Sequence, residues 1–175
     1  MNILSILLFT TFGWSNPVID STLIYSDVQL ECQIENDLID SLINNGKELI
    51  GTPYKYGGNS TKGIDCSGLV HYIFGSMGAD VARTSRDLSQ LGHKVEIDQI
   101  SKGDLVFFKG RNVNSNTVGH VAYVVEGSGK GIVFLHATSK GVLLDKMVGN
   151  EYYVKRFLFA KRLEYEEFFE FNIYN

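Results

Sequence analysis

The first half of the chain carries apolar residues at the spacing of helices. From Asn36 onward they recur every three or four positions, and Gly51-Thr52-Pro53 ends the run. The positions are Leu38, Ile39, Leu42, Ile43, Leu49 and Ile50. This pattern predicts a helix of about 14 residues with Asn36 as its N-cap. Residues 18–35 show no firm period, so we interpret residues 17–37 as a lead-in segment of undefined structure.

A second helix is predicted within the stretch GIDCSGLVHYIF, residues 63–74. Leu69, Val70, Ile73 and Phe74 form one apolar stripe, and the glycines at 75 and 78 mark the end of the helix. The preceding stretch PYKYGGNSTKG, residues 53–63, is rich in glycine and polar residues and is predicted to be a loop.

After residue 103 the pattern changes to that of β-strands. Segments rich in β-branched and aromatic residues follow one another, with short turn signals between them. They span residues 104–109, 120–126, 132–137, 142–148 and 154–163. Such short connections favour antiparallel pairing, because parallel strands need long crossovers. Helices followed by a sheet predict the α+β fold class.

Length and charge indicate one domain, which would have to hold a polyanionic partner by shape and local hydrogen bonds. The chain has 175 residues, of which 44% are hydrophobic, enough for a single core. It carries 16 Lys and Arg against 20 Asp and Glu, for a net charge of −4. No basic field exists to hold nucleic acid. We expect a monomer that binds no nucleic acid.

Residues 1–16 form an uncharged apolar segment with two interpretations. The run from Ile3 to Trp14 has the length of a signal-peptide core and is too short to span a bilayer. No Lys or Arg follows Met1 and no small-x-small cleavage site is evident, so a buried N-terminal strand or helix is the alternative. A signal peptide would make the protein secreted or periplasmic, within the cell envelope, with no stable membrane insertion after processing.

Two further features carry no assigned chemistry. The chain has two cysteines, far fewer than a disulfide-stapled scaffold, and we interpret Cys32 as a small buried packing residue. The acidic, aromatic tail at residues 164–175 is interpreted either as a strand at the sheet edge or as a docked peptide.

Cys66 is the candidate nucleophile because it begins a predicted helix. A cysteine attacks as the thiolate, and the free N–H groups and dipole of a helix N-terminus lower the pKa of a thiol. The same N–H groups can hold the oxyanion of a tetrahedral intermediate. Taken alone, the neighbouring Asp65 and Ser67 are equally well interpreted as helix caps.

Two of the four histidines are candidate partners for Cys66. His120 and His136 lie on adjacent predicted strands among apolar neighbours, so both can point at one spot. His120 would accept the thiol proton and later protonate the leaving amine, while His136 would orient the His120 ring as the third member of a triad. His71 lies too far along its helix to face Cys66, and His93 falls in a predicted loop. This spacing is not that of a zinc site, and no cofactor or metal is expected.

Six short motifs follow one another through residues 38–163. They are GTPYKYGG, DCSGLV, ARTS, KGDLVFF, GHVAYVV and LHATSKGV. In order and spacing they resemble the NlpC family of papain-like bacterial cell-wall cysteine peptidases. The resemblance implies a papain-like α+β fold, with the cysteine helix packed on an antiparallel sheet of about five strands, and a catalytic domain at 38–163. It also implies hydrolysis of peptidoglycan stem peptides or muropeptides, typically between D-γ-glutamate and a diamino acid such as diaminopimelate.

The resemblance assigns the three catalytic positions and one tyrosine. Cys66 matches the family nucleophile, His120 the base and His136 the third polar residue. A tyrosine hydroxyl lines the site in this family, and the motif leaves it open whether Tyr54 or Tyr56 supplies it here.

The resemblance also suggests residues that bind substrate. Asp65 and Ser67 match the positions that hold a free L-alanine amine in some members. Arg83 and Ser85 match a segment that borders the cleft, although Arg83 is equally well interpreted as a brace for its loop.

Other functions remain open on the same residues. The same hydrolysis could serve an interbacterial cell-wall toxin, and the same fold could support a thiol-dependent amidase or acyltransferase. A non-enzymatic binding module is the weakest alternative, because all three catalytic positions are filled.

Overall fold

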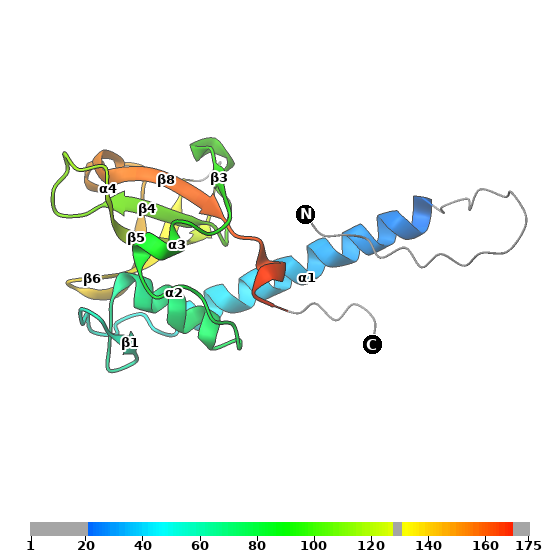
Figure 1. The fold of residues 1–175 in the computed structure, drawn as a ribbon, viewed down its shortest axis with the longest axis horizontal. Coiled ribbons are helices and arrows are strands. Elements are labelled where there is room, and N and C mark those ends of the chain that lie inside the picture. The colour runs from blue at the N-terminus through cyan, green and yellow to red at the C-terminus, as the bar shows by residue number, and fades with distance from the viewer. Residues whose placement is uncertain (1–20, 128–130, 170–175) are drawn as a thin grey trace, which may run out of the picture.

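The computed structural model describes residues 21–127 and 131–169. The predicted signal segment, residues 1–16, lies outside the described residues, as does the end of the tail from 170 onward. Helices come first and an antiparallel sheet follows (Figure 1), which confirms the predicted α+β class. Within the described part of the chain, no helix combines the length and apolar character needed to cross a membrane.

Helix α1 (Ser21–Lys47) is much longer than predicted. The expected start at Asn36 is wrong, because the Asn36 side chain donates to the Cys32 carbonyl oxygen within the helix (2.7 Å) instead of capping a helix end. The buried residues Ile39, Leu42 and Ile43 lie toward its C-terminal end. The N-terminal half extends away from the sheet (Figure 1). Cys32 lies there and is exposed, so its interpretation as a buried residue is also wrong.

Helix α2 (Cys66–Gly75) matches its prediction. Leu69, Val70, Ile73 and Phe74 are all buried, and the helix packs against the sheet at β5. The loop before it contains a small hairpin that was not predicted. Its two antiparallel strands, β1 (Asn59–Ser60) and β2 (Gly63–Ile64), have two residues each. A short helix, α3 (Ser85–Leu88), follows α2.

The main sheet has six antiparallel strands in the order β3-β8-β4-β5-β6-β7. Their bounds are β3 (His93–Val95), β4 (Leu105–Lys109), β5 (Val118–Glu126), β6 (Val133–Thr138), β7 (Gly141–Lys146) and β8 (Phe157–Arg162). β4 to β7 form a meander, whereas β8 returns to the other side of β4 and pairs with β3. β3 was not predicted. Of the strand predicted over residues 154–163, β8 confirms residues 157–162, whereas the first three residues belong to α4 (Glu151–Arg156).

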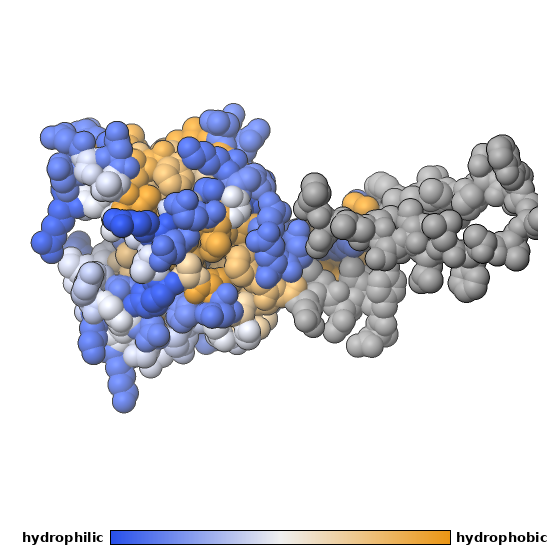
Figure 2. Space-filling view, viewed as in Figure 1, coloured by the Kyte–Doolittle hydropathy of each residue, from blue (hydrophilic) through white to orange (hydrophobic). Residues whose placement is uncertain are grey.

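Hydrophobic clusters cover both faces of the sheet. The larger one joins α1 and α2 to one face. The smaller one, on the other face, includes Phe108, Phe134 and Tyr153 and lies beneath α4. Figure 2 shows apolar residues reaching the surface over the centre of the face in view, bordered by hydrophilic ones.

The described part of the tail docks onto the larger cluster. Tyr165 begins a turn of 3-10 helix (Tyr165–Glu167), is buried, and stacks on Phe74 with ring centroids 5.9 Å apart. Its hydroxyl donates to the Gly103 carbonyl oxygen at 2.8 Å. Of the two interpretations of the tail, residues 164–169 fit the docked peptide.

Candidate active site

Cys66 stands at the N-terminus of α2, beside the strand that carries His120. Asp65 caps the helix by accepting a hydrogen bond from the Gly68 amide at 2.7 Å. The backbone N–H of Val121 on β5 points to the Cys66 sulfur and opposes the rise in its pKa. Cys66 is a free, partly exposed thiol, and the Val121 amide beside it belongs to the residue that follows His120. The structure therefore brings the predicted nucleophile and base to one region.

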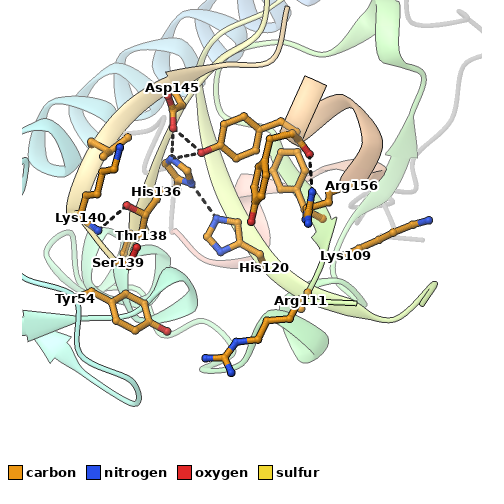
Figure 3. A pocket seen from close by; sticks show the side chains of 17 residues that line it. Tyr54, Lys109, Arg111, His120, His136, Thr138, Ser139, Lys140, Asp145 and Arg156 are labelled. Atoms are coloured by element: carbon orange, nitrogen blue, oxygen red, sulfur yellow. Dashed lines mark hydrogen bonds and ion pairs between the residues drawn. The ribbon is translucent and has the colours of Figure 1, made fainter. Parts of the chain in front are cut away.

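A chain of hydrogen bonds runs from His120 into the sheet. Nε2 of His120 lies 2.9 Å from Nδ1 of His136, and Nε2 of His136 lies 3.1 Å from Oδ2 of Asp145. The Tyr153 hydroxyl donates to the same Asp145 oxygen at 2.5 Å. Figure 3 shows the side chains of His120, His136 and Asp145 in a row, with Asp145 at the end opposite His120. His136 is fully buried and links His120 to Asp145 within the core.

The carboxylate at the end of this chain determines the tautomers of both histidines. An ionised carboxylate only accepts hydrogen bonds, so Nε2 of His136 must carry the proton. Nδ1 of neutral His136 then accepts, and Nε2 of His120 must donate to it. The lone pair of His120 is thereby left on Nδ1. The arrangement thus presents a basic nitrogen at the end opposite Asp145.

Burial keeps both reacting groups neutral at rest. Burial, with a smaller contribution from His136, lowers the pKa of His120 to about 3, so the imidazole is unprotonated near neutral pH. Burial also raises the pKa of the Cys66 thiol, and the Asp65 charge adds to the rise. Among the described residues, no hydrogen bond joins Cys66 to His120. The site therefore rests as a thiol and a neutral base, a pair suited to proton transfer when substrate arrives.

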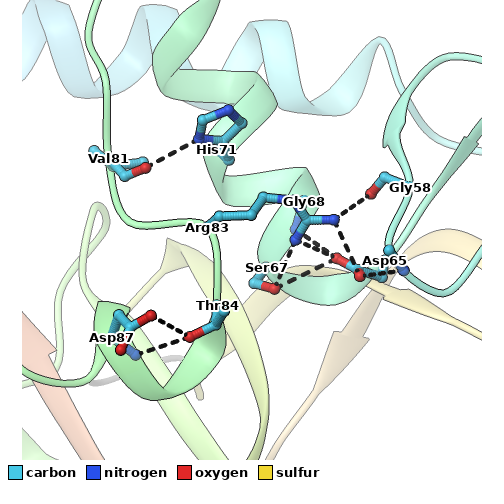
Figure 4. A network of polar contacts seen from close by, with 10 residues as sticks. Gly58, Asp65, Ser67, Gly68, His71, Val81, Arg83, Thr84 and Asp87 are labelled. Carbon is cyan, nitrogen blue, oxygen red and sulfur yellow. Dashed lines mark hydrogen bonds and ion pairs between the residues drawn. The ribbon is translucent and has the colours of Figure 1, made fainter.

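Asp65 is held in a clasp with Arg83 (Figure 4). The Arg83 guanidinium donates to both carboxylate oxygens, at 3.0 and 3.2 Å, and also to Ser67 Oγ at 3.1 Å and the Gly58 carbonyl oxygen at 2.9 Å. The Gly57 amide donates to Asp65 Oδ2 at 2.8 Å. The negative charge of Asp65 is thus already balanced by a cation and satisfied by backbone donors. Of the predicted cleft residues, Ser85 lies in the first turn of α3, outside this clasp.

Two glycines allow the close approaches around the site. A Cβ on Gly68 would lie 2.1 Å from the Gly58 carbonyl oxygen, so only glycine lets the loop reach the N-terminus of α2. A Cβ on Gly119 would lie 2.4 Å from the Gly110 Cα, where β4 and β5 meet beside His120. Both positions need the missing side chain to bring the backbone this close.

The two candidate tyrosines have different surroundings. Tyr54 lines the cavity beside His120, whereas Tyr56 is 88% exposed. Burial raises the pKa of Tyr54, and the neighbouring Cys66 and Asp65 add to the rise while Arg111 opposes it. Of the two tyrosines, Tyr54 is the one that lines the cavity together with His120.

A cavity of about 600 Å³ opens beside the two histidines. Its lining includes Lys109, Arg111, Lys140 and Arg156, contributed by β4, the β4–β5 loop, the β6–β7 turn and α4 (Figure 3). Asp145 is the acidic residue in this lining. A chain with a net charge of −4 thus has a predominantly cationic cavity at its candidate active site.

The sequence did not predict Asp145, Tyr153 or the four cations. A single carboxylate inside the mostly apolar segment VLLDKMV could have drawn attention to Asp145. It lies diagonally across the β6–β7 pair from His136, which faces Leu143. The cations come from separate elements, and no sequence spacing relates them.

The two remaining histidines lie outside the site. His71 contacts the Val81 carbonyl oxygen at 3.0 Å, and His93 contacts Glu164 at 2.7 Å. His93 lies on β3 and not in the predicted loop. Over the described ranges, no group of three His, Cys, Asp or Glu side chains is arranged to hold a metal ion.

Comparison with known proteins gives one family. The family model described as NlpC/P60 family matches residues 51–162. A probable endopeptidase of Haemophilus influenzae is 36% identical over 118 residues, which cover 66% of this chain and 69% of that protein. A gamma-D-glutamyl-L-lysine dipeptidyl-peptidase of Bacillus cereus is 41% identical over 90 residues, covering 51% of this chain and 27% of that protein.

Solved structures give the same fold. The crystal structure of an NlpC/P60 family protein from Bacillus cereus matches with a TM-score of 0.61 and 33% identity, over 71% of this chain and 39% of that one. The chain spans 27% and 34% of two of the curated relatives that it matches, from Bacillus cereus and Bacillus subtilis. Those relatives therefore contain long segments with no counterpart in the aligned region.

Proposed function

The chain belongs to the NlpC/P60 family, and we propose that it is a cysteine endopeptidase acting on peptidoglycan stem peptides. The observation that carries the proposal is the hydrogen-bonded chain His120–His136–Asp145, which ends beside a free cysteine at a helix N-terminus. Endopeptidase and dipeptidyl-peptidase names among its relatives support the reaction class. An enzyme of this kind works at the cell wall, which fits export to the envelope or beyond.

Acylation begins with proton transfer from the Cys66 sulfur to Nδ1 of His120. The sulfur attacks the carbonyl carbon of the scissile amide, and the backbone N–H groups at the start of α2 receive the oxyanion. The intermediate collapses when the amine leaves with the proton held by His120. A thioester remains on Cys66, and a water molecule activated by His120 hydrolyses it. The carboxyl product departs and the thiol is restored.

His136 and Asp145 support the imidazolium that forms during both steps. When His120 gains a proton on Nδ1, its Nε2–H continues to donate to His136, and the Asp145 carboxylate lies beyond that ring. The positive charge therefore forms along a row of groups already oriented to stabilise it. In this scheme His136 is the third member of the triad, and Asp145 is a positioning residue.

The cleaved bond is proposed to join D-γ-glutamate to a diamino acid. The Bacillus relatives are named for action on gamma-D-glutamyl-L-lysine, a linkage of this type. Tyr54 is the tyrosine proposed to face the substrate, because it lines the cavity while Tyr56 points outward.

Asp65 and Ser67 are proposed to brace the N-terminus of α2 and not to hold a free L-alanine amine. An amine clamp needs a carboxylate with unsatisfied charge, but Arg83 forms a two-point ion pair with Asp65 and also donates to Ser67. Arg83 thereby takes the alternative role considered for it from the sequence, that of a structural residue that braces its loop. Stem peptides with free and with acylated L-alanine amines should be hydrolysed at similar rates.

The test is digestion of purified muropeptides, with products identified by mass spectrometry. The expected products end in D-glutamate on one side and begin with the diamino acid on the other. The Cys66→Ala variant should be inactive, and Lys146→Ala, an exposed change on β7 outside the cavity, should be fully active. Transfer of the acyl group to an acceptor other than water would indicate an acyltransferase. Hydrolysis by Cys66→Ala would remove the proposed nucleophile.

A further inference from the structure

Tyr153 is the buried residue of α4 and lies against the buried histidine of the site. Its ring centroid is 5.5 Å from that of His136 and 5.0 Å from that of Phe134. Its hydroxyl donates to Asp145 Oδ2 at 2.5 Å and lies 3.4 Å from Nε2 of His136. Tyr153 therefore contacts the last two members of the hydrogen-bonded row that starts at His120, yet no step of the proposed mechanism uses it.

Asp145 occupies a position from which its side chain could turn away from the histidines. It lies on β7, the outermost strand on that side of the sheet, and a third of its side chain is exposed. In the strand register it faces Phe134, so it reaches His136 only along the diagonal. Among the described residues, its side chain accepts hydrogen bonds from His136 and Tyr153, both on Oδ2. The Tyr153 hydroxyl thus holds the carboxylate in the orientation that faces His136.

The position of one proton on His136 decides whether His120 can act as a base. Burial lowers the pKa of His136 and Asp145 opposes this, so the ring is neutral near neutral pH and has a single N–H. With that proton on Nε2, the ring donates to Asp145, accepts from His120, and leaves Nδ1 of His120 free. With the proton on Nδ1, His136 would instead donate to Nε2 of His120, whose own proton would then occupy Nδ1. The second tautomer blocks the nitrogen that must accept the thiol proton.

The Tyr153 hydroxyl has one hydrogen and two acceptors within reach. Burial and the Asp145 carboxylate raise the pKa of Tyr153, so the phenol stays protonated and acts as a donor. A hydrogen donated to Asp145 leaves the proton of His136 on Nε2. The same hydrogen donated to Nε2 of His136 would require a lone pair there and would impose the blocked tautomer. The charged carboxylate is the stronger acceptor, so its presence selects the productive arrangement.

We propose that Tyr153 is a positioning residue of the peptidase reaction, which aims Asp145 at His136 and together with it sets the tautomer that frees Nδ1 of His120. The inference rests on the proposed endopeptidase function and adds a residue to it. It has a consequence that a merely structural role lacks. The hydroxyl assists catalysis while Asp145 is present and hinders it when Asp145 is removed, because its hydrogen then turns to Nε2 of His136.

The first test determines the tautomer of His136 without substrate. Nitrogen NMR spectra of isotope-labelled histidines distinguish a protonated from an unprotonated ring nitrogen. The parent protein should carry the His136 proton on Nε2, and Asp145→Ala should carry it on Nδ1. The double variant Asp145→Ala/Tyr153→Phe should populate both tautomers, since no hydroxyl remains to select one. The parental tautomer in Asp145→Ala would overturn the inference.

The second test measures kcat on a purified muropeptide. Tyr153→Phe keeps the ring and should lower kcat roughly fivefold, the effect of one net hydrogen bond, with KM unchanged. Tyr165→Phe is the matched control: it removes a buried hydroxyl that donates to the Gly103 carbonyl oxygen in the cluster on the opposite face of the sheet. It should lower the free energy of unfolding in urea titrations and leave kcat at the parental value.

The decisive comparison adds Tyr153→Phe to Asp145→Ala. Here the loss of the hydroxyl should raise kcat, again roughly fivefold, because the blocked tautomer is no longer favoured. Equal kcat in Asp145→Ala and the double variant, or a further loss in the double variant, would overturn the inference while the endopeptidase function stands. A parent protein that hydrolyses no muropeptide would reject the proposed function, and the NMR spectra would still decide whether Tyr153 and Asp145 set the tautomer.

Discussion

Replacing Asp145 with asparagine tests whether the carboxylate stabilises charge on His120 through His136. Asparagine keeps an oxygen that can accept from His136 and Tyr153, so the tautomers are preserved and only the charge is removed. We expect an enzyme that folds, binds substrate and turns over slowly. The change isolates the electrostatic contribution of Asp145 from its role as an acceptor.

The expected loss of kcat in Asp145→Asn follows from the distances along the hydrogen-bonded row His120–His136–Asp145. Hydrogen bonds of 3.1 and 2.9 Å and one imidazole ring separate the Asp145 oxygen from Nε2 of His120, a separation on the order of 8 Å. A third of the Asp145 side chain is exposed, so an effective dielectric constant of about 20 applies, and the interaction is about 2 kcal/mol. Because each 1.4 kcal/mol or so is a factor of ten in rate, kcat should fall by roughly 30-fold.

The assay follows kcat on a purified muropeptide for Asp145→Asn, His136→Asn and the double variant. If Asp145 acts through His136, the second substitution should cost almost nothing in the His136→Asn background. Chemical denaturation of each variant separates loss of rate from loss of folding. A kcat for Asp145→Asn within twofold of the parent would refute the reasoning, as would equal losses in both backgrounds.

Three further outcomes test separate features of the site. Tyr54→Phe should lower kcat/KM several-fold, because a single hydrogen bond contributes about 1 kcal/mol, whereas Tyr56→Phe should be silent in the same steady-state assay. Arg83→Ala should lower the free energy of unfolding by about 2 kcal/mol through loss of its charged hydrogen bonds, and the exposed Arg86→Ala should change it little in urea titrations. The pKa of His120, lowered to about 3 by burial and its histidine neighbour, keeps the base unprotonated through the acidic range. kcat/KM at pH 5 should therefore stay close to its value at pH 7, and a loss of about 30-fold would indicate a base with the ordinary histidine pKa.

Local signals made the central elements of the fold predictable. The stripe of Leu69, Val70, Ile73 and Phe74 and the cap at Asp65 lie within one short segment, so α2 could be placed from its own residues. The strands of the meander carry strong β-branched and aromatic patterns with short turns, and these too depend on local sequence.

The errors arise where tertiary contacts override local preference. The strand predicted over residues 154–163 begins three residues too early, because Asn150 caps α4 by accepting from the Tyr152 amide at 3.1 Å and Tyr153 of that helix is buried. β3 is short and polar, and exists because β8 pairs with it from far along the chain. Residues 28–33 of α1 are exposed and show no apolar period.

The residues of the candidate site also differ in whether local sequence or tertiary structure determines their position. Cys66, His120 and His136 could be proposed because each has a local context, a helix start or an apolar strand. Asp145 joins them only through the diagonal register of β6 and β7. The cavity cations depend on the folding of four distant elements around one space, which no local pattern encodes.

The most direct test of the account is capture of the acyl-enzyme on Cys66. A muropeptide is mixed with the protein, the reaction is stopped with acid within the first turnover, and the peptide containing Cys66 is analysed by mass spectrometry. The proposed mechanism predicts a thioester that carries the D-glutamyl half of the substrate, formed more slowly in Asp145→Asn and absent in Cys66→Ala. Hydrolysis that proceeds with an unmodified Cys66 peptide, or with Cys66→Ala, would contradict it.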